Sequence, residues 1–191
     1  MNSELHPLEP FLPVTAKLLM LGSFPPPRKR WSMDFYYPNL QNDMWRIVGF
    51  LFFEDKEYFL TPDCRHFDRE RIVAFCEQQG IAMYDTAVEI IRLKDNASDN
   101  FLQVVHEVNL AALLARIPAC HTVVTTGQKA TDTLRTITAC DEPTVGGEVD
   151  FLYANRAMRL YRMPSSSRAY PRSIEWKAAF YRSMFAGCGM L

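Results

Sequence analysis

The chain has 191 residues, of which 48% are hydrophobic and 23% charged, and its formal net charge is −1. This composition is that of a globular protein and excludes an intrinsically disordered chain, while the longest apolar runs, residues 16–21 and 47–53, are too short to cross a bilayer. A net charge so close to zero also disfavours a protein that binds nucleic acid mainly through a surplus of Lys and Arg.

The length predicts one domain, residues 1–191. Residues 1–13 mix acidic side chains with prolines and carry no signal-peptide pattern, so we expect a cytoplasmic protein. The five cysteines have no Cys-x-x-Cys spacing, which indicates reduced thiols rather than a zinc or iron–sulfur site. We therefore predict no cofactor.

Along the chain, short apolar runs that end in turn-forming residues alternate with helical patterns. The predicted order is a strand at 16–21, helices at 43–52 and 68–79, a strand at 81–84, a helix at 101–116, a strand at 122–126, a helix at 128–138, a strand at 158–163 and a helix at 173–185. Residues 151–154 are predicted to pair with the last strand as an edge hairpin. Strands that alternate with helices indicate a parallel sheet covered on both faces.

Ligands of such sheets bind outside the carboxyl ends of the strands, which selects four loops as a candidate site. These loops are residues 23–42, 85–99, 127–128 and 165–171. Residues 127–129 open a helix after the third strand and are a weak candidate for an anion site. No role is assigned to the four histidines, which lie outside the loops: His6, His66, His106 and His121.

Three of these loops carry sequence motifs. Residues 22–26 read GSFPP and are followed by YYPNLQNDMWR at residues 36–46, and residues 163–170 read MPSSSRAY. The loop at 85–99 contains Arg92, Asn96 and Ser98. Together the segments resemble the opening motif, the serine-rich second motif and the base-reading segment of the uracil-DNA glycosylase superfamily. They are most similar to its mismatch-specific and hypoxanthine-DNA glycosylase branches.

The resemblance implies a three-layer α/β/α sandwich with a central, mainly parallel four-stranded sheet. It also implies a monomeric DNA glycosylase of base excision repair, which flips out uracil or hypoxanthine and hydrolyses the N-glycosidic bond without metal or cofactor. The implied partner is DNA containing a damaged base, with no membrane association. Two positions depart from the family pattern, because Phe24 stands where an Asp or Asn is usual and Met163 replaces a His.

The resemblance assigns water handling to Asn42, as in the hypoxanthine-type relatives, although an Asn before Asp43 is equally suited to capping a helix. It assigns contact with the flipped base to Phe24, Tyr36, Tyr37 and Asp85. Tyr37 is expected to stack on the base, with core packing as the alternative. An ionised Asp85 only accepts hydrogen bonds and so favours a base with a ring N–H, unless it merely caps a turn.

The remaining candidate residues are expected to bind DNA phosphates: Ser23, Ser165, Ser166, Ser167 and Arg168. Two other functions compete with the glycosylase. A non-catalytic module that binds nucleic acid or a nucleotide is favoured by Phe24 at the position of the usual acid and by the absence of a basic surplus. A serine hydrolase using Ser165 or Ser23 ranks last, because neither serine lies in a G-x-S-x-G elbow and no His falls in the four loops.

Overall fold

The computed structural model describes residues 3–94 and 99–191 of the chain. The larger of its two sheets has five strands in the order β3-β2-β6-β8-β7. These strands are β2 (Leu18–Gly22), β3 (Ile81–Asp85), β6 (Thr122–Thr126), β7 (Glu148–Tyr153) and β8 (Arg156–Met163). Neighbouring strands among β3, β2, β6 and β8 are parallel, and β7 pairs antiparallel with β8.

The expected four-stranded sheet is therefore wrong in strand number, although the mixed α/β class and the mainly parallel arrangement are confirmed. The four predicted strands correspond to β2, β3, β6 and β8, and the predicted edge hairpin supplies the fifth strand. Its turn consists of Ala154 and Asn155, with φ values of 48° and 59°. Two successive residues with positive φ form the tight turn that suits the twist of an antiparallel pair.

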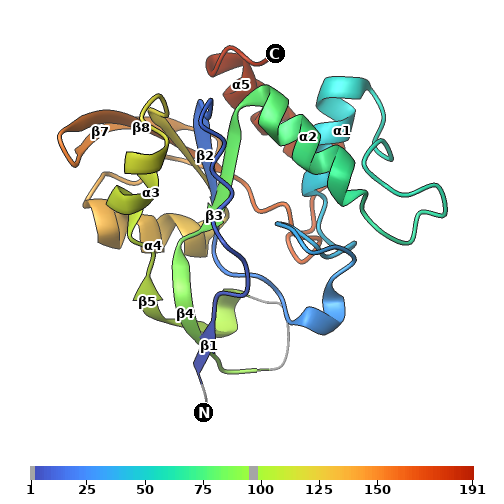
Figure 1. Ribbon diagram of the computed structural model, residues 1–191, viewed down its shortest axis with the longest axis horizontal. Coiled ribbons are helices and arrows are strands. Elements are labelled where there is room, and N and C mark those ends of the chain that lie inside the picture. Colours follow the sequence, from blue (N-terminus) through green and yellow to red (C-terminus); the bar gives the residue numbers. More distant parts are fainter. Residues whose placement is uncertain (1–2, 95–98) are drawn as a thin grey trace.

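The helices cover both faces of the larger sheet. They are α1 (Met44–Phe53), α2 (Arg69–Gln79), α3 (Leu110–Arg116), α4 (Gln128–Thr138) and α5 (Ile174–Gly187). Figure 1 shows α1, α2 and α5 on one side of the sheet and α3 and α4 on the other. Among the described residues, no helix combines the length and the apolar character needed to span a membrane.

A second, antiparallel sheet lies outside the predicted pattern. It has the order β1-β4-β5, with β1 (Ser3–Leu5), β4 (Ala87–Arg92) and β5 (Leu102–Glu107), and two 3₁₀ turns, η1 (Arg28–Arg30) and η2 (Asp99–Phe101), complete the elements. The predicted helix at 101–116 is thus wrong in its first half. The β-branched Val104 and Val105 favour a strand paired with β4, and the helix begins only after Asn109, whose side chain accepts a hydrogen bond from the Ala112 N–H.

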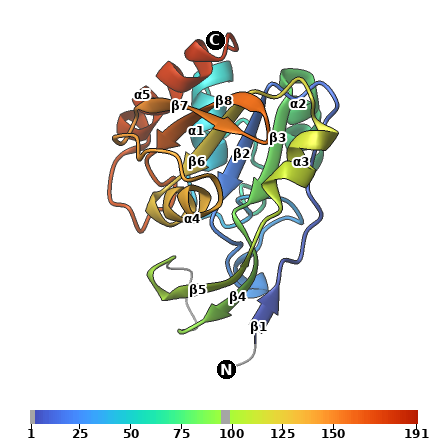
Figure 2. The same ribbon diagram turned by 90° about the vertical axis from the view of Figure 1, so that its left-hand side faces the viewer.

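The small sheet lies beyond the carboxyl ends of β2 and β3 (Figure 2). Strand β3 continues into β4 through Thr86, whose backbone N–H donates to the carbonyl of Gly22 at 2.9 Å. Consequently β1 and the β4–β5 hairpin stand beside the strand ends where an α/β sheet binds ligands. The parallel core, packed by Trp45, Phe59, Tyr181 and Phe185, holds this edge in place.

A glycine comparison tests how tightly α2 is joined to the sheet. Gly80 ends α2 with φ +72°, and an added Cβ would lie 2.6 Å from the Thr15 carbonyl oxygen, whereas Gly189 has φ +67° with nothing within 4 Å. We expect Gly189→Ala to lose about 1–2 kcal/mol of unfolding free energy from left-handed strain. Gly80→Ala should lose that amount plus about 1–3 kcal/mol from the backbone clash. Urea denaturation measures both, and equal losses would contradict the close approach.

Candidate functional site

A cavity of about 670 Å³ lies at the carboxyl ends of the parallel strands. This volume is typical of pockets that bind small molecules. The cavity is lined by the loops that follow β2, β3, β6 and β8, and it includes all of the predicted site residues except Arg168. The residues that sequence motifs placed in three separate loops therefore come together around one space: Ser23, Phe24, Tyr36, Tyr37, Asn42, Asp85, Ser165, Ser166 and Ser167.

Backbone hydrogen bonds join the loop after β2 to the loop after β8. The Asp43 N–H donates to the Ser166 carbonyl at 2.8 Å, and the Arg168 N–H donates to the Gln41 carbonyl at 3.0 Å. Asn42 and Ser167 form an isolated antiparallel bridge between these contacts. The start of α1 and the serine-rich loop thus form one wall of the cavity.

A buried ion pair with α5 also stabilises this wall of the cavity. Lys177 of α5 is fully buried and its Nζ donates to Asp43 Oδ2 at 3.2 Å and to the Ser167 carbonyl at 2.9 Å. Arg168 Nε donates to the other Asp43 oxygen at 2.9 Å. The carboxylate of Asp43 is therefore held by two cations, and it makes no side-chain cap bond to α1. The sequence analysis assigned Lys177 no role, although it lies in the buried stripe of α5 with Tyr181 and Met184.

The side chain of Asn42 caps the backbone at the start of α1. Its Oδ1 accepts a hydrogen bond from the Met44 N–H at 2.9 Å. A carboxamide oxygen has a second lone pair, so this contact leaves Asn42 able to accept another hydrogen bond from the cavity. Asp43 is the N-cap residue of α1, so the capping alternative holds only in that Asn42 binds the first N–H of the helix, and a role in water handling is compatible with this contact.

Tyr37 stands at the cavity in a strained backbone conformation. Its φ is 52°, which is uncommon for a residue other than glycine and is found at sites held in place by their surroundings. The hydroxyl is 2.9 Å from Thr126 Oγ1 and the ring packs edge-to-face against Trp45. Burial, followed by the nearby Asp85 carboxylate, raises the pKa of Tyr37 well above its usual value. The hydroxyl is therefore neutral near pH 7.

Tyr36 and Phe24 belong mainly to the packed wall. Tyr36 is 3% exposed and its hydroxyl donates to the Glu9 carbonyl at 2.7 Å. Phe24 is 8% exposed and packs against Ala87, Ile90 and Leu102 of the small sheet. Both residues still line the cavity. Only the part of each ring that is exposed to the cavity is therefore available for the predicted contact with a base.

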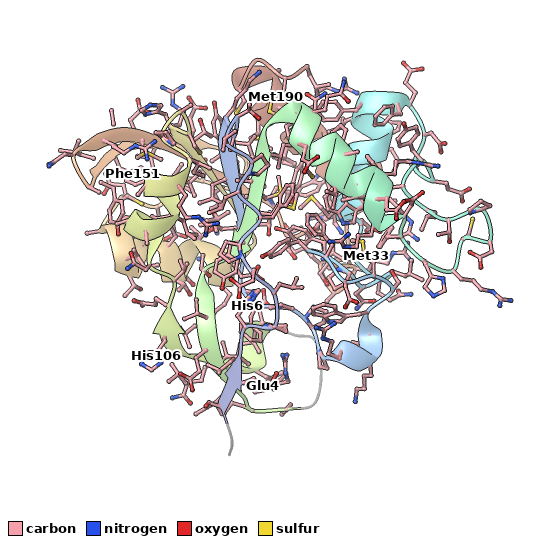
Figure 3. The ribbon with its side chains drawn as sticks, viewed as in Figure 1. Glu4, His6, Met33, His106, Phe151 and Met190 are labelled. Atoms are coloured by element: carbon pink, nitrogen blue, oxygen red, sulfur yellow. The ribbon has the colours of Figure 1, made fainter. Side chains whose placement is uncertain are left out.

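His6 pairs with Asp85 inside this wall. Its Nε2 lies 2.8 Å from Asp85 Oδ2, and the two side chains are only 2% and 9% exposed. Figure 3 places His6 between the small sheet, marked by Glu4 and His106, and the body of the molecule. Sequence reasoning missed this partner because His6 follows β1, a strand that gave no recognisable pattern.

A second carboxylate, Asp99, also lines the cavity. Ser23 Oγ donates to Asp99 Oδ1 at 2.7 Å. Burial raises the pKa of Asp99 above its usual value, and the Ser23 hydrogen bond partly offsets this. Of the other residues expected in the base-reading segment, Arg92 contacts Glu4 and the Pro25 carbonyl, and Asn96 and Ser98 lie outside the described residues.

The three serines of the last loop have different surroundings. Ser166 is 2% exposed, whereas Ser165 and Ser167 are half-buried. Ser165 Oγ accepts from the Ser167 N–H at 3.3 Å, and Ser167 Oγ accepts from the Ala169 N–H at 3.2 Å. The predicted contact with phosphate is therefore sterically easier for Ser165 and Ser167 than for Ser166.

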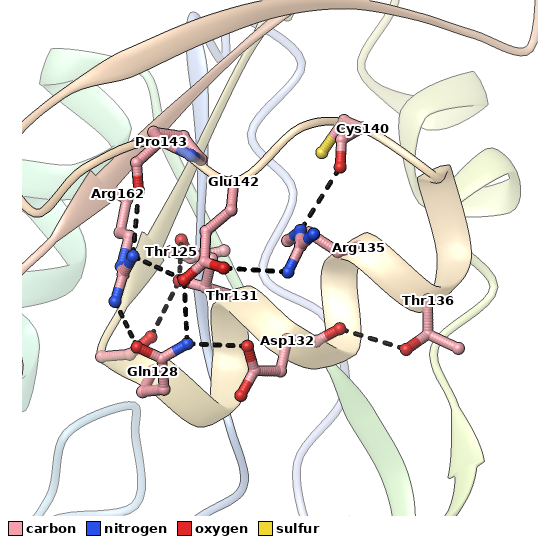
Figure 4. A network of polar contacts seen from close by, with 11 residues as sticks. Thr125, Gln128, Thr131, Asp132, Arg135, Thr136, Cys140, Glu142, Pro143 and Arg162 are labelled. Carbon is pink, nitrogen blue, oxygen red and sulfur yellow. Dashed lines mark hydrogen bonds and ion pairs between the residues drawn. The ribbon is translucent and has the colours of Figure 1, made fainter.

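The N-terminus of α4 lines the cavity. Its first side chain, that of Gln128, is held by several hydrogen bonds (Figure 4). Gln128 donates to Asp132 at 2.7 Å and to Glu142 at 3.1 Å, and it accepts from Arg162. Glu142 also accepts from Arg162 and from Arg135, and these contacts hold the pKa of Glu142 below its usual value, with the Gln128 hydrogen bond as the largest cause. The anion site predicted at residues 127–129 stays a prediction.

Comparison with known proteins finds similarity among solved structures. No protein-family model matches the sequence, and no curated protein does. The chain resembles a solution NMR structure from Methanosarcina acetivorans of a protein provisionally named a uracil DNA glycosylase. The two chains are 20% identical, the TM-score is 0.58, and the match covers 93% of this chain and 96% of that chain. This likeness shows a common fold.

Removal of Lys177 tests the buried ion pair. Lys177→Met keeps most of the length of the unbranched side chain but leaves the Asp43 carboxylate buried with Arg168 as its bound cation. Breaking a buried pair on one side costs about 3–5 kcal/mol of unfolding free energy. We expect a loss of this size in urea denaturation and a smaller loss in the double variant Asp43→Asn/Lys177→Met. A double variant as unstable as the sum of the two single variants would exclude coupling between them.

The raised pKa of Asp99 has a consequence for stability. Folding makes ionisation of this carboxyl harder, so the folded state loses stability as the pH rises from the ordinary pKa of an aspartate, about 3.9, through the higher pKa of the folded state. Asp99→Asn removes this cost and should raise the Tm at pH 7, on the order of 2–4 °C for each kcal/mol recovered in a chain of this size. The gain should vanish at pH 3 in thermal scans, and Asp141→Asn, at an exposed position, is the control.

Proposed function

We propose that this protein is a DNA glycosylase that flips a deaminated base, uracil or hypoxanthine, out of DNA and hydrolyses its N-glycosidic bond in base excision repair. The observation that carries the proposal is the convergence of Tyr37, Asn42 and Asp85, from motif-bearing loops, on one cavity at the strand ends. The common fold with a protein provisionally named a uracil DNA glycosylase supports it. Fold alone does not determine function, so the argument depends on the site.

The cavity has the parts needed to hold an extruded base. Flipping costs a few kcal/mol for unstacking, which contacts in the pocket must offset. Stacking on an aromatic ring contributes about 1–3 kcal/mol per base, and Tyr37 is proposed to supply it. Phe24 and Tyr36 complete the aromatic wall, and the Asp85 carboxylate is proposed to contact the edge of the base.

Cleavage of the N-glycosidic bond builds positive charge on the sugar and negative charge on the departing base, and catalysis follows from groups that suit this distribution. The Asn42 Oδ1 atom uses one lone pair to accept the hydrogen bond from Met44. Its other lone pair is proposed to accept a hydrogen bond from the attacking water and so to position it. An amide orients water but takes up no proton, so most of the rate must come from stabilisation of the leaving base. The neutral Tyr37 and Thr126 hydroxyls are proposed to contribute to that stabilisation, because they line the same cavity.

Binding of the DNA backbone is proposed to involve Ser23, Ser165, Ser167 and neighbouring backbone N–H groups at the rim of the cavity. Arg168 is proposed to approach a phosphate from outside the cavity, where its side chain is 44% exposed although its Nε is bound to Asp43. The Ser166 side chain is buried, and its backbone carbonyl accepts a hydrogen bond from Lys177, which helps to hold the serine-rich loop. We propose that the protein acts on DNA as a monomer, with residues 1–191 forming one domain.

Two observations favour a different function. The Asn42 oxygen is engaged in capping α1, and the position of the usual acid is taken by Phe24, which is packed into the small sheet. These features suit a module that binds nucleic acid or a nucleotide without cleaving it. Such a module would retain the cavity and its stacking residue but have no need to place water.

Substitution of Asn42 separates the two functions. Duplex and single-stranded oligonucleotides containing uracil or hypoxanthine are incubated with protein, and abasic sites are detected by alkaline strand cleavage. We expect excision by the wild type and at least a 100-fold lower rate for Asn42→Ala, because misplacement of a reacting group by about 1 Å has an effect of that size. Salt-dependent binding without product, at stoichiometric protein, would favour the binding module.

The matched control is Asn109→Ala. Asn109 also accepts a hydrogen bond from a backbone N–H at a helix start, at 3.0 Å, but it lies outside the cavity. Both variants should lose about 1 kcal/mol of unfolding free energy through the missing cap, whereas only Asn42→Ala should lose excision. Equal loss of excision in both variants would reduce the role of Asn42 to stability.

A further inference from the structure

The carboxylate of Asp85 is held in one orientation by its surroundings. Its Oδ2 receives the 2.8 Å contact from His6 Nε2. Its Oδ1 lies beside Gly22, where an added Cβ would be only 2.4 Å from this oxygen and 3.5 Å from the Tyr37 hydroxyl. Glycine at this position therefore gives the carboxylate room on the side of Tyr37. One oxygen is bound to the wall, and the other is on the side of the proposed stacking residue.

The imidazole of His6 is itself held by hydrogen bonds and ring contacts. Its Nδ1 is 2.9 Å from the Leu8 carbonyl oxygen and 3.2 Å from the Leu8 backbone nitrogen. The ring contacts the rings of Phe24 and Tyr84, with centroids 5.3 Å and 4.6 Å away. Because Nδ1 is near both a donor and an acceptor, Nε2 can carry a proton toward Asp85 in the neutral and in the charged ring. A hydrogen bond to a buried carboxylate is strong and directional.

We propose that His6 is a positioning residue that aims Asp85 at the pairing edge of the flipped base, so that the pocket selects bases with a ring N–H at that edge. The inference rests on the proposed function and names the chemistry that its substrates share. Uracil has an N3–H group, whereas N3 of cytosine carries no hydrogen and is an acceptor. Hypoxanthine likewise has an N1–H group, whereas N1 of adenine is an acceptor. A carboxylate oxygen, which only accepts, pairs with the deaminated base and faces an acceptor in the parent base.

The consequence is a general filter for deamination. A site built to bond one hydrogen on its ligand can reject the analogue that lacks it by about 10⁴-fold, because the buried polar group is left without a partner. This selection requires that the free Asp85 oxygen cannot rotate away from the base. The contact between His6 and the other Asp85 oxygen meets this requirement. Thymine and guanine carry a ring N–H at the same edge, so they must be excluded by other features of the pocket.

The test compares excision rates on oligonucleotides that contain hypoxanthine, adenine, uracil or cytosine. His6→Phe keeps an aromatic ring between Phe24 and Tyr84 but donates no hydrogen bond to Asp85. We expect kcat/KM for hypoxanthine and uracil to fall about 10–100-fold, the usual effect of losing a hydrogen bond to a charged group. The preference for each deaminated base over its parent should fall by at least 10-fold.

His6→Gln distinguishes positioning from packing. The Gln side-chain amide can donate to Asp85 Oδ2 from nearly the same place as Nε2, so it should restore the preference even if it packs less well than Phe. His106→Phe is the matched control, since His106 is an exposed histidine on β5 that binds Glu89. Circular dichroism and thermal scans confirm that each variant is folded.

The outcomes separate the two proposals. A wild type that excises no base and binds hypoxanthine-containing strands no better than adenine-containing ones would overturn the proposed function and this inference together. Wild-type excision with an unchanged rate and preference in folded His6→Phe would overturn the role of His6 alone. Loss of preference in His6→Phe with recovery in His6→Gln supports it.

Discussion

The cavity depends on the buried ion pair between Asp43 and Lys177. These residues are 134 positions apart in the chain, and their contact, with the carbonyls of Ser166 and Ser167, fixes the loop after β2 against the loop after β8. Removing two charges from water is costly, and the cost is offset only where each remaining hydrogen-bonding group has a partner. Here Arg168 supplies the second cation and the loop carbonyls accept from the ammonium. The arrangement therefore specifies one geometry for the wall that carries Asn42.

The opposite part of the site depends on the small sheet rather than on the parallel sheet. Strand β1 delivers His6, β4 continues directly from Asp85, and η2 brings Asp99 to Ser23. Asp85 and Asp99 thus reach the cavity, whose lining also contains aromatic side chains and the charged residues Lys129, Asp132 and Arg162. Asp85 and Asp99 are each bound by a short side-chain hydrogen bond, which keeps a buried acidic group from being left without a partner. Local charge at the cavity is set by these contacts, and the net charge of −1 over the whole chain gives little information about it.

Most of the larger sheet followed from the sequence. Short β-branched and apolar runs that end at Gly, Pro or Asp predicted β2, β3, β6 and β8. An acid-rich start and a glycine end placed α2 within a residue at each end. The small sheet was missed because its strands are short and half-exposed, and because residues 101–107 have an amphipathic pattern that also fits a helix. Pairing with β4, which is a tertiary contact, decided the strand conformation of Val104 and Val105.

The sequence by itself determined which loops contain the candidate site residues, since strand ends and motif residues are local properties of the chain. It therefore placed Tyr37, Asn42 and Asp85 in loops that the structure brings to one cavity. Only the tertiary structure decided which distant residues are their partners: His6 for Asp85 and Thr126 for Tyr37. The contact of Asn42 with Met44 is local, and the sequence already suggested it as a helix cap. The physical reason is that a hydrogen bond between distant segments requires both to be held in register by the core. The spacing of residues along the chain does not show which distant segments will be adjacent. Lys177 and His6 were therefore assigned no role until the fold placed them beside Asp43 and Asp85.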